Sequence, residues 1–206
     1  MVILRYSKSV KYTVPLRNLL RNGTVVAGPT ETAYGLLASA VNKPAVSEVV
    51  RLKGRNEHKP IALVAADLRM VQQYFRLSSD ELRLAKKFWP GALTLLLKPR
   101  RKFPLAVIGI SGRVGVRVPG SVWLRKFCAA VGVPLTATSA NRAGASTPYS
   151  ATEVISQLGR RGLRYIIDGG RLLKRPTSTV VLASRGTLTV VRRGMISQQR
   201  LHKVMR

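Results

Sequence analysis

The sequence predicts an α/β protein built on a twisted, mixed sheet with flanking helices. Two observations predict this class. Short β-branched runs alternate with helical patterns along the chain, and the last two strands are joined through ASRG, which favours an antiparallel hairpin. With 206 residues and 46% hydrophobic content, the chain is expected to form a single domain over residues 1–206.

Eight strands are expected where β-branched or apolar runs end in turn residues. They cover 24–27, 61–65, 93–97, 114–118, 135–138, 164–167, 178–182 and 187–192. The first strand, TVVA, leads into GPTETAYG, where Thr30 or Thr32 could cap a helix. None of the apolar runs approaches the roughly 20 residues of a membrane span.

Six helices are expected, five between these strands and one after the last of them. They cover 44–53, 67–75, 79–88, 121–131, 150–158 and 196–204. In the first, Pro44 suits the opening turn, and Val46, Val49, Val50 and Lys53 recur at helical spacing. Ser121 is the expected start of the fourth helix. Helices interleaved with strands in this way indicate a mixed α/β sheet.

The net charge is the strongest compositional signal. The chain carries 36 Lys and Arg against 8 Asp and Glu, a formal charge of +28. Between Glu81 and Glu153 there are twelve basic residues and no acidic one. Such a field attracts polyanions, and nucleic acid is the first candidate. The alternative is a basic surface that only keeps the protein solvated.

Most common catalytic motifs are absent from the sequence. The only histidines, His58 and His202, lack nearby ligand clusters, so no protein-built metal site is expected. No P-loop, dinucleotide-binding or nucleophile-elbow pattern occurs. The single cysteine, Cys128, lies in an apolar helical segment, excludes an internal disulfide and fits a reducing, cytoplasmic location. The N-terminal segment has its basic residues after its apolar ones, the reverse of a secretory signal.

Polar clusters occur instead at several strand ends. Lys53, Arg55 and Lys59 in RLKGRNEHKP could form a phosphate clamp, or could be ordinary partners of a helix C-terminus. Ser139 and Asn141 in LTATSANRAG could donate to a phosphate, or could form a simple turn. This donor-rich, cationic set is nearly free of general bases, which favours phosphoryl or nucleotidyl transfer over acyl hydrolysis.

In this order, the clusters resemble the YrdC-type family of threonylcarbamoyl-AMP synthases. The resemblance runs through RNGTVVAGPTETAYGL, RLKGRNEHKPIALV, FWPGALTLLL, VGVRVP, PLTATSANRAG, IIDGG, TSTVV and VVRRG, over roughly residues 15–195. It implies a twisted open sheet around a large basic cavity. It also implies synthesis of threonylcarbamoyl-AMP and pyrophosphate from L-threonine, bicarbonate and ATP. A partner complex would then transfer the threonylcarbamoyl group to the tRNA adenosine next to the anticodon.

The resemblance also implies roles for individual residues. The catalytic signature falls on Lys53, Arg55, Ser139 and Asn141. ATP-binding positions are Arg55, Lys59, Arg113, Ser139, Thr147 and Arg192. Threonine-binding positions are Thr32, Arg117, Ala137 and Ser178, with Arg117 as the partner of the substrate carboxylate. Mg²⁺ is expected to arrive with ATP, with no tightly bound cofactor.

The chain departs from the family pattern at three places. Val64 stands where some relatives have a histidine near threonine, and RPTSTVV lacks the acidic residue that often precedes Ser-Thr-Val. The chain ends soon after VVRRGMI, so the short, single-domain form is expected. The high positive charge and the Val64 departure leave an alternative function, a non-catalytic RNA-binding module. No membrane partner is expected.

Overall fold

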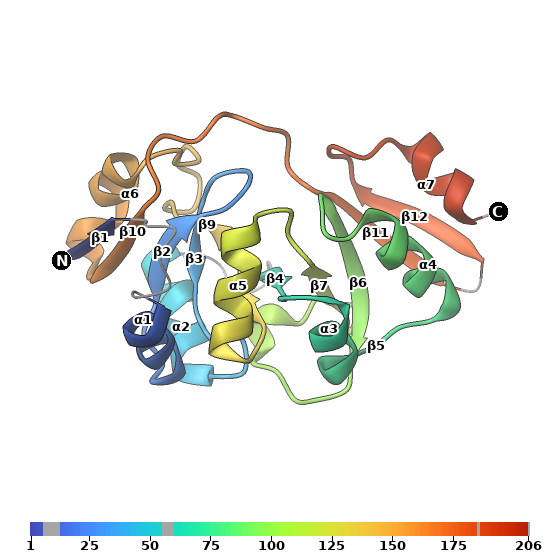
Figure 1. Cartoon of the computed structure of the whole chain (residues 1–206), viewed down its shortest axis with the longest axis horizontal. Coiled ribbons are helices and arrows are strands. Elements are labelled where there is room, and N and C mark those ends of the chain that lie inside the picture. The colour runs from blue at the N-terminus through green and yellow to red at the C-terminus, as the bar shows by residue number, and fades with distance from the viewer. Residues whose placement is uncertain (6–12, 55–59, 185, 206) are drawn as a thin grey trace.

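Two twisted sheets, flanked by helices, make up the fold (Figure 1). The computed structural model describes residues 1–5, 13–54, 60–184 and 186–205. The predicted α/β class and the mixed strand directions are confirmed, but the strands divide into two sheets rather than one.

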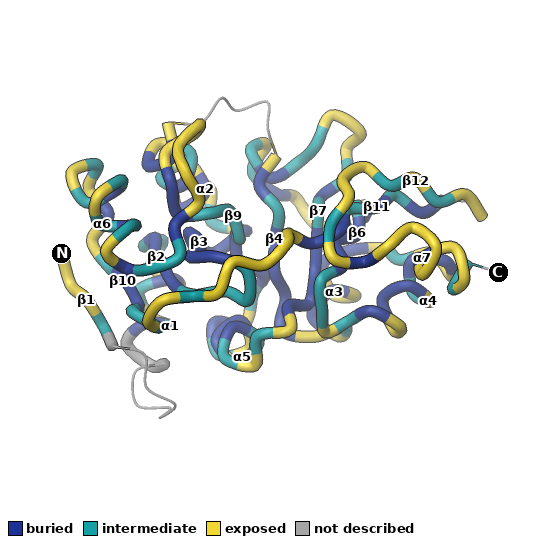
Figure 2. Tube along the Cα trace, turned by 90° about the horizontal axis from the view of Figure 1, so that it is seen from above, coloured by how far each residue is buried: buried dark blue, intermediate teal, exposed yellow. Residues whose placement is uncertain are grey.

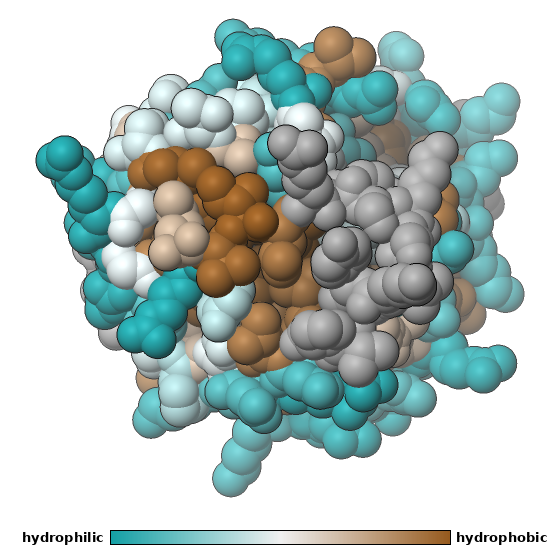
Figure 3. All heavy atoms as spheres, turned by 60° about the vertical axis from the view of Figure 1, so that its left-hand side comes forward, coloured by the Kyte–Doolittle hydropathy of each residue, from teal (hydrophilic) through white to brown (hydrophobic). Residues whose placement is uncertain are grey.

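The first sheet combines three strands from the N-terminal part of the chain with two strands from its second half. Its strands, in spatial order, are β1 (Val2–Arg5), β10 (Tyr165–Asp168), β2 (Val26–Pro29), β3 (Tyr34–Leu37) and β9 (Thr138–Ser139). β1, β10 and β2 are parallel, whereas β3 is antiparallel to both β2 and β9. β1 is an edge strand on which Val2 and Ile3 are about half exposed, and Figure 3 shows apolar atoms gathered on this side of the molecule.

The second sheet contains the C-terminal hairpin. Its strands, in spatial order, are β12 (Thr187–Arg192), β11 (Thr179–Ser184), β6 (Leu93–Pro99), β7 (Val114–Arg117), β4 (Leu63–Val64) and β8 (Leu135–Thr136). The short β5 (Phe75–Arg76) pairs with β6. β11 and β12 are antiparallel, as their connecting segment predicts.

Residues 135–140, here called the crossing segment, join the two sheets. The predicted single strand 135–138 is instead β8 in one sheet followed by β9 in the other. The amide of Thr136 donates to Ala38 O (2.9 Å), whereas the amide of Ala137 donates to Ala62 O (2.8 Å). One extended segment therefore bonds to both sheets, which holds their edges together.

Helices cover the outer faces of the sheets. They are α1 (Thr13–Arg21), α2 (Lys43–Lys53), α3 (Leu68–Tyr74), α4 (Ser79–Phe88), α5 (Val122–Val131), α6 (Ala151–Leu158) and α7 (Gln198–Met205), with 3₁₀ turns η2 (Leu105–Val107) and η3 (Gly159–Arg161). Figure 2 shows α2 and α5 on opposite sides of the buried strands. α5 packs against α1, and α4 packs against α7.

The segment GPTETAYG forms a β-hairpin turn, not the start of a helix. The Thr30 hydroxyl accepts from the amides of Thr32 and Ala33 (both 3.2 Å) and donates to Ala33 O (2.7 Å). These are the bonds that an N-cap would make, but they close the turn between β2 and β3. The expectation of a helix cap was wrong because the two motifs use the same hydroxyl chemistry.

Candidate active site

A cavity of about 320 Å³ lies where the two sheets meet. Its described wall combines the β2–β3 turn, the crossing segment, β6, β7, the end of β12 and the segment before β11. Six threonines, two serines and three arginines contribute to this wall, and no carboxylate residue is among its described members. The cavity is therefore positively charged and rich in hydrogen-bond donors, which suits an anionic ligand.

A buried ion pair forms the inner part of the site. Arg117 Nη1 donates to Glu31 Oε1 at 2.6 Å, and the side chains are only 10% and 16% exposed, respectively. Burial lowers the pKa of Arg117 from its usual range, and the neighbouring Glu31 carboxylate opposes that shift. Arg117 therefore lines the cavity as a cation, and Glu31 holds its guanidinium group in place.

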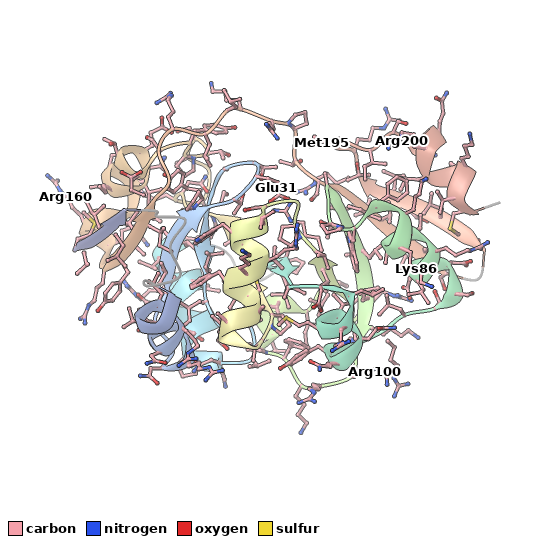
Figure 4. All side chains as sticks on the ribbon, viewed as in Figure 1. Glu31, Lys86, Arg100, Arg160, Met195 and Arg200 are labelled. Atoms are coloured by element: carbon pink, nitrogen blue, oxygen red, sulfur yellow. The ribbon has the colours of Figure 1, made fainter. Side chains whose placement is uncertain are left out.

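Glu31 is engaged through one oxygen only. Its Oε1 also lies 3.4 Å from the amide of Gly120, whereas its Oε2 is buried and has no hydrogen-bond partner among the described residues. Figure 4 places Glu31 in the middle of the molecule, near α5. Glu31 is a positioning residue, because its contact is with Arg117 and it is outside the described cavity wall.

We expect Glu31→Gln to destabilise the fold by about 2 kcal/mol, because breaking a buried pair strands the remaining charge. For a chain of this length, that loss lowers the Tm by about 4–8 °C. Thermal unfolding measures this loss.

The matched control is Glu48→Gln, which removes an exposed pair with Arg51 whose side chains are 35% and 56% exposed. Exposed pairs contribute little, so its stability should change by less than about 0.5 kcal/mol. Equal stability changes for the two variants would show that the Glu31 carboxylate has no special role.

A second arginine reaches the same cavity from β12. Arg192 Nη2 donates to Ser178 O (2.9 Å) and lies 3.2 Å from Ser178 Oγ, which is 2.8 Å from Thr94 Oγ1. Burial lowers the pKa of Arg192, and the positive charge of Arg117 lowers it further. An anion between the two guanidinium groups would relieve this repulsion.

Gly194 explains how the end of β12 approaches this wall so closely. A Cβ at Gly194 would overlap the backbone of Thr177 and Ser178. The next amide, that of Met195, donates to Thr177 O at 3.0 Å. The glycine of VVRRG therefore permits the contact that places Arg192 beside Ser178.

Lys53 holds the loop that follows β9. It is the last residue of α2, which begins at the N-cap Asn42 and ends at the left-handed Gly54 (φ 58°). Its Nζ donates to Ser139 O (2.5 Å), Asn141 O (3.1 Å) and Asn141 Oδ1 (3.0 Å), and Lys53 is only 5% exposed. The Lys53 ammonium group therefore holds this loop in place through hydrogen bonds to its backbone and to the Asn141 side chain.

Within that loop, Ser139 and Asn141 have different positions. Ser139 Oγ donates to Asn141 Oδ1 (2.6 Å), and Asn141 Nδ2 donates to Ala145 O (2.6 Å). Ser139 lines the cavity, whereas Asn141 is buried behind it. Substrate contact by Lys53 and Asn141 stays a prediction, and in this structure both shape the loop that presents Ser139.

The predicted site residues fall into three groups. Those that line the cavity are Thr32, Arg117, Ala137, Ser139, Thr147, Ser178 and Arg192. Lys53, Asn141 and Arg113 lie outside the described wall, and Arg113 Nη1 donates to Glu81 Oε1 (3.1 Å) and Leu96 O (3.0 Å). Arg55 and Lys59 lie outside the described residues. Val64 is fully buried and is not part of the described wall.

Several wall residues were not predicted from the sequence, and Tyr34 is the clearest case. Its hydroxyl donates to Gly170 O (2.7 Å) and accepts from the amide of Gly169 (2.9 Å). Burial raises the pKa of Tyr34 to about 12, so it stays protonated and keeps the segment after β10 against β3. Among the wall residues that were not predicted, Thr94 had the clearest signal in the sequence, because its hydroxyl interrupts the apolar run LTLLL.

Other chemistry is poorly supported by the described part of the chain. No three His, Cys, Asp or Glu side chains gather there to hold a metal ion. Cys128 is fully buried on α5, which raises the pKa of its thiol and disfavours a nucleophilic role. Among the described helices, none is long and apolar enough to cross a membrane.

Known proteins resemble this chain over most of its length. A Methanocaldococcus jannaschii relative is 30% identical over 186 residues, covering 90% of this chain and 87% of its own. The Bacillus subtilis protein named threonylcarbamoyl-AMP synthase is 34% identical over 190 residues, covering 91% of this chain but 54% of its own. This chain thus spans about half the length of the B. subtilis relative.

Solved structures show the same fold. Pyrococcus abyssi Sua5 complexed with L-threonine matches with a TM-score of 0.89 and 30% identity, covering 99% of this chain and 61% of the other. Escherichia coli YciO matches with a TM-score of 0.83 and 24% identity, covering 97% of both chains, which supports the fold alone. The sequence model of the Sua5, YciO and YrdC proteins, described as "Telomere recombination", matches residues 18–194. The motifs, the two-sheet fold and this match together establish that the chain belongs to the Sua5/YciO/YrdC family.

Proposed function

We propose that the protein is a threonylcarbamoyl-AMP synthase, a nucleotidyltransferase that uses L-threonine, bicarbonate and ATP. The observation that carries the proposal is the cavity, where Arg117, Arg192 and hydroxyl groups converge without a described carboxylate. All three substrates are anionic or carry a carboxylate, so this wall suits them. Membership of a family that includes a threonine-complexed Sua5 supports the same assignment.

The threonine end of the cavity is formed by Thr32, Arg117, Ala137 and Ser178. Arg117 pairs with the substrate carboxylate, and its orientation is set by Glu31. Ser178 presents a hydroxyl already positioned by Thr94 and Arg192. Ala137, on the crossing segment, has a small side chain that leaves room for the substrate. The substrate amine is thereby oriented toward the remainder of the cavity.

The nucleotide end is formed by Ser139, Thr147 and Arg192 in the described wall. Arg55, Lys59 and Arg113 complete our proposed ATP set, the first two from outside the described residues. Guanidinium, ammonium and hydroxyl donors match phosphate oxygens rather than a metal ion. Mg²⁺ therefore belongs to this site as a companion of ATP, where it would neutralise phosphate charge.

The reaction has two balanced steps. The neutral amine of threonine attacks the bicarbonate carbon, water leaves, and a carbamate forms. A carbamate oxygen then attacks the α-phosphorus, the bond to the β-phosphate oxygen breaks, and pyrophosphate leaves. The described residues contribute by orienting the reactants and by stabilising negative charge, which are the main demands of such transfers.

Pyrophosphate release tests this function. Purified protein should release pyrophosphate from ATP only when threonine and bicarbonate are both present. Ser139→Ala should slow the release by at least about tenfold, because one hydrogen-bond donor at a developing charge contributes that much. Release that does not depend on threonine would contradict the proposal.

The surface supports a further part of the proposal, contact with RNA. Each acidic side chain among the described residues has a hydrogen-bond or ion-pair partner. Three of them form ion pairs with exposed arginines: Glu48 with Arg51, Asp80 with Arg83, and Glu153 with Arg171. Of the many cations left over, Lys86, Arg100, Arg160 and Arg200 are exposed, and Figure 4 shows Arg100 and Arg160 at the edge of the molecule. This surface suits tRNA, and the product would pass to a tRNA threonylcarbamoyl-transfer complex in the cytoplasm.

The alternative is a non-catalytic RNA-binding module. It is motivated by the charge of +28 and by the Val64 departure, but Val64 is buried outside the described wall, and the organised cavity favours catalysis. RNA binding that weakens steeply with salt fits either function. RNA binding without any threonine-dependent pyrophosphate release would favour the module. In either case we propose that residues 1–206 form one domain, because the two sheets share the crossing segment.

A further inference from the structure

Residues 169–178, here called the strap, pass from β10 in one sheet to β11 in the other (Figure 1). The strap has no helix or strand of its own, and most of it is exposed (Figure 2). At one end it is fastened by Tyr34, and the amide of Leu172 donates to Tyr149 O at 2.8 Å. At the other end Ser178 is bonded to Thr94 and Arg192. Both ends are therefore held against the cavity wall.

Arg175 lies between these two fastenings and lines the cavity. It is exposed, and no hydrogen bond or ion pair is formed by its side chain within the part of the chain that the structure describes. The other two arginines of the wall have partners, Glu31 for Arg117 and Ser178 for Arg192. Arg175 is thus the wall arginine whose guanidinium is available in full to a ligand.

We propose that Arg175 binds the β- and γ-phosphates of ATP, the part that leaves as pyrophosphate. This inference rests on the proposed function, and it extends the site to the strap. On one side of Arg175 the strap contacts Tyr149, which is two residues after Thr147. On the other side is Ser178, which is bonded to Arg192. Thr147 and Arg192 are both proposed nucleotide contacts, so the same ligand lies within reach of the strap.

The difference in burial between the arginines indicates which part of the ligand each one takes. Arg117 is a buried, partly neutralised cation that suits a single carboxylate. Arg175 is exposed, and its planar fork can bind two phosphate oxygens at once. The α-phosphate must lie near the threonine end, because the carbamate attacks it there. The outer phosphates then occupy the more exposed side, where Arg175 lies.

The test is calorimetric binding of four probes: ATP, AMP, inorganic tripolyphosphate and L-threonine. We expect Arg175→Ala to weaken ATP and tripolyphosphate binding by about tenfold or more, as for loss of a charge-assisted bidentate contact. AMP and threonine binding should change by less than about twofold. Arg175→Lys should retain part of the affinity, because it keeps the charge but not the fork.

Lys174→Ala is the matched control. Its Nζ lies 5.8 Å from the centre of the Tyr149 ring, and Lys174 is not part of the described wall. It removes the same charge from the neighbouring position, so general attraction would weaken equally in both variants. Equal weakening, or normal ATP binding by Arg175→Ala, would overturn the inference and leave the proposed function intact.

If the unaltered protein bound neither ATP nor tripolyphosphate, both proposals would be overturned. The unaltered protein could also bind tripolyphosphate but not ATP. If Arg175→Ala then abolished tripolyphosphate binding, the anion site at Arg175 would stand, but the synthase function would be overturned.

Discussion

Arg117→Ala is expected to lower kcat/KM for threonine by at least about 100-fold, while the KM for ATP changes by less than about threefold. Loss of a charge-assisted contact with the substrate carboxylate accounts for about 1.5–3 kcal/mol. Without the guanidinium, the Glu31 carboxylate also remains beside the substrate carboxylate and repels it. Pyrophosphate release at varied threonine and ATP concentrations measures both parameters.

A second substitution separates these two causes. Adding Glu31→Ala to Arg117→Ala removes the repulsion, so part of the threonine affinity should return, although Glu31→Ala removes yet another polar group. Arg117→Lys should be intermediate, because it keeps the charge without the two-pronged geometry. If the double variant were weaker than Arg117→Ala by the full effect of Glu31→Ala alone, the residues would act independently. That result would contradict the proposed coupling.

Lys53→Met is expected to lower both activity and stability. The substitution keeps the aliphatic stem but leaves Ser139 O, Asn141 O and Asn141 Oδ1 without the ammonium donor. Asn141 Oδ1 keeps the Ser139 hydroxyl as a donor, but loss of the ammonium bonds to these buried acceptors should lower the free energy of unfolding by about 3 kcal/mol. Activity should fall by about 100-fold even below the unfolding temperature, because Ser139 loses its support. Pyrophosphate release and thermal unfolding measure the two losses.

Lys43→Met is the matched control, since Lys43 is exposed at the other end of the same helix. Its activity and stability should match those of the unaltered protein to within about 0.5 kcal/mol. Hydrogen exchange provides the structural readout, because residues 139–145 should exchange faster in Lys53→Met. Unchanged exchange there, together with lost activity, would mean that Lys53 acts by touching substrate rather than by holding the loop.

Local sequence signals predicted the elements whose stability is mainly local. Helix α4 was expected at its observed bounds, 79–88, and in the structure Ser78 and Glu81 form a capping box at its start. The final strand was also expected at its observed bounds, 187–192. In contrast, β3 was missed because its four buried residues show no alternation and the preceding threonines resemble a helix cap.

The division into two sheets could not be read from the sequence. An extended segment has the same local pattern whichever strands it pairs with, and the crossing segment changes partners within three residues. β1 and α1 were missed because the N-terminal basic residues obscure the apolar pattern.

The site was predictable to the extent that its residues belong to recognisable motifs. Glu31 and Arg117 are 86 residues apart, so spacing alone could not identify them as partners. Arg175 was missed because the strap has no periodicity, and an exposed arginine in a basic chain carries no signal by itself. The fold is what brings these charges to one cavity.

The most direct test of the proposed function is identification of the product. Purified protein is incubated with ATP, L-threonine and ¹³C-bicarbonate, and the nucleotide products are analysed by mass spectrometry, with Arg117→Ala as the comparison. We expect a threonylcarbamoyl-adenylate that carries the label, forms together with pyrophosphate, and is strongly reduced in Arg117→Ala. Release of pyrophosphate with no labelled adenylate, or equal product from Arg117→Ala, would contradict the proposed function.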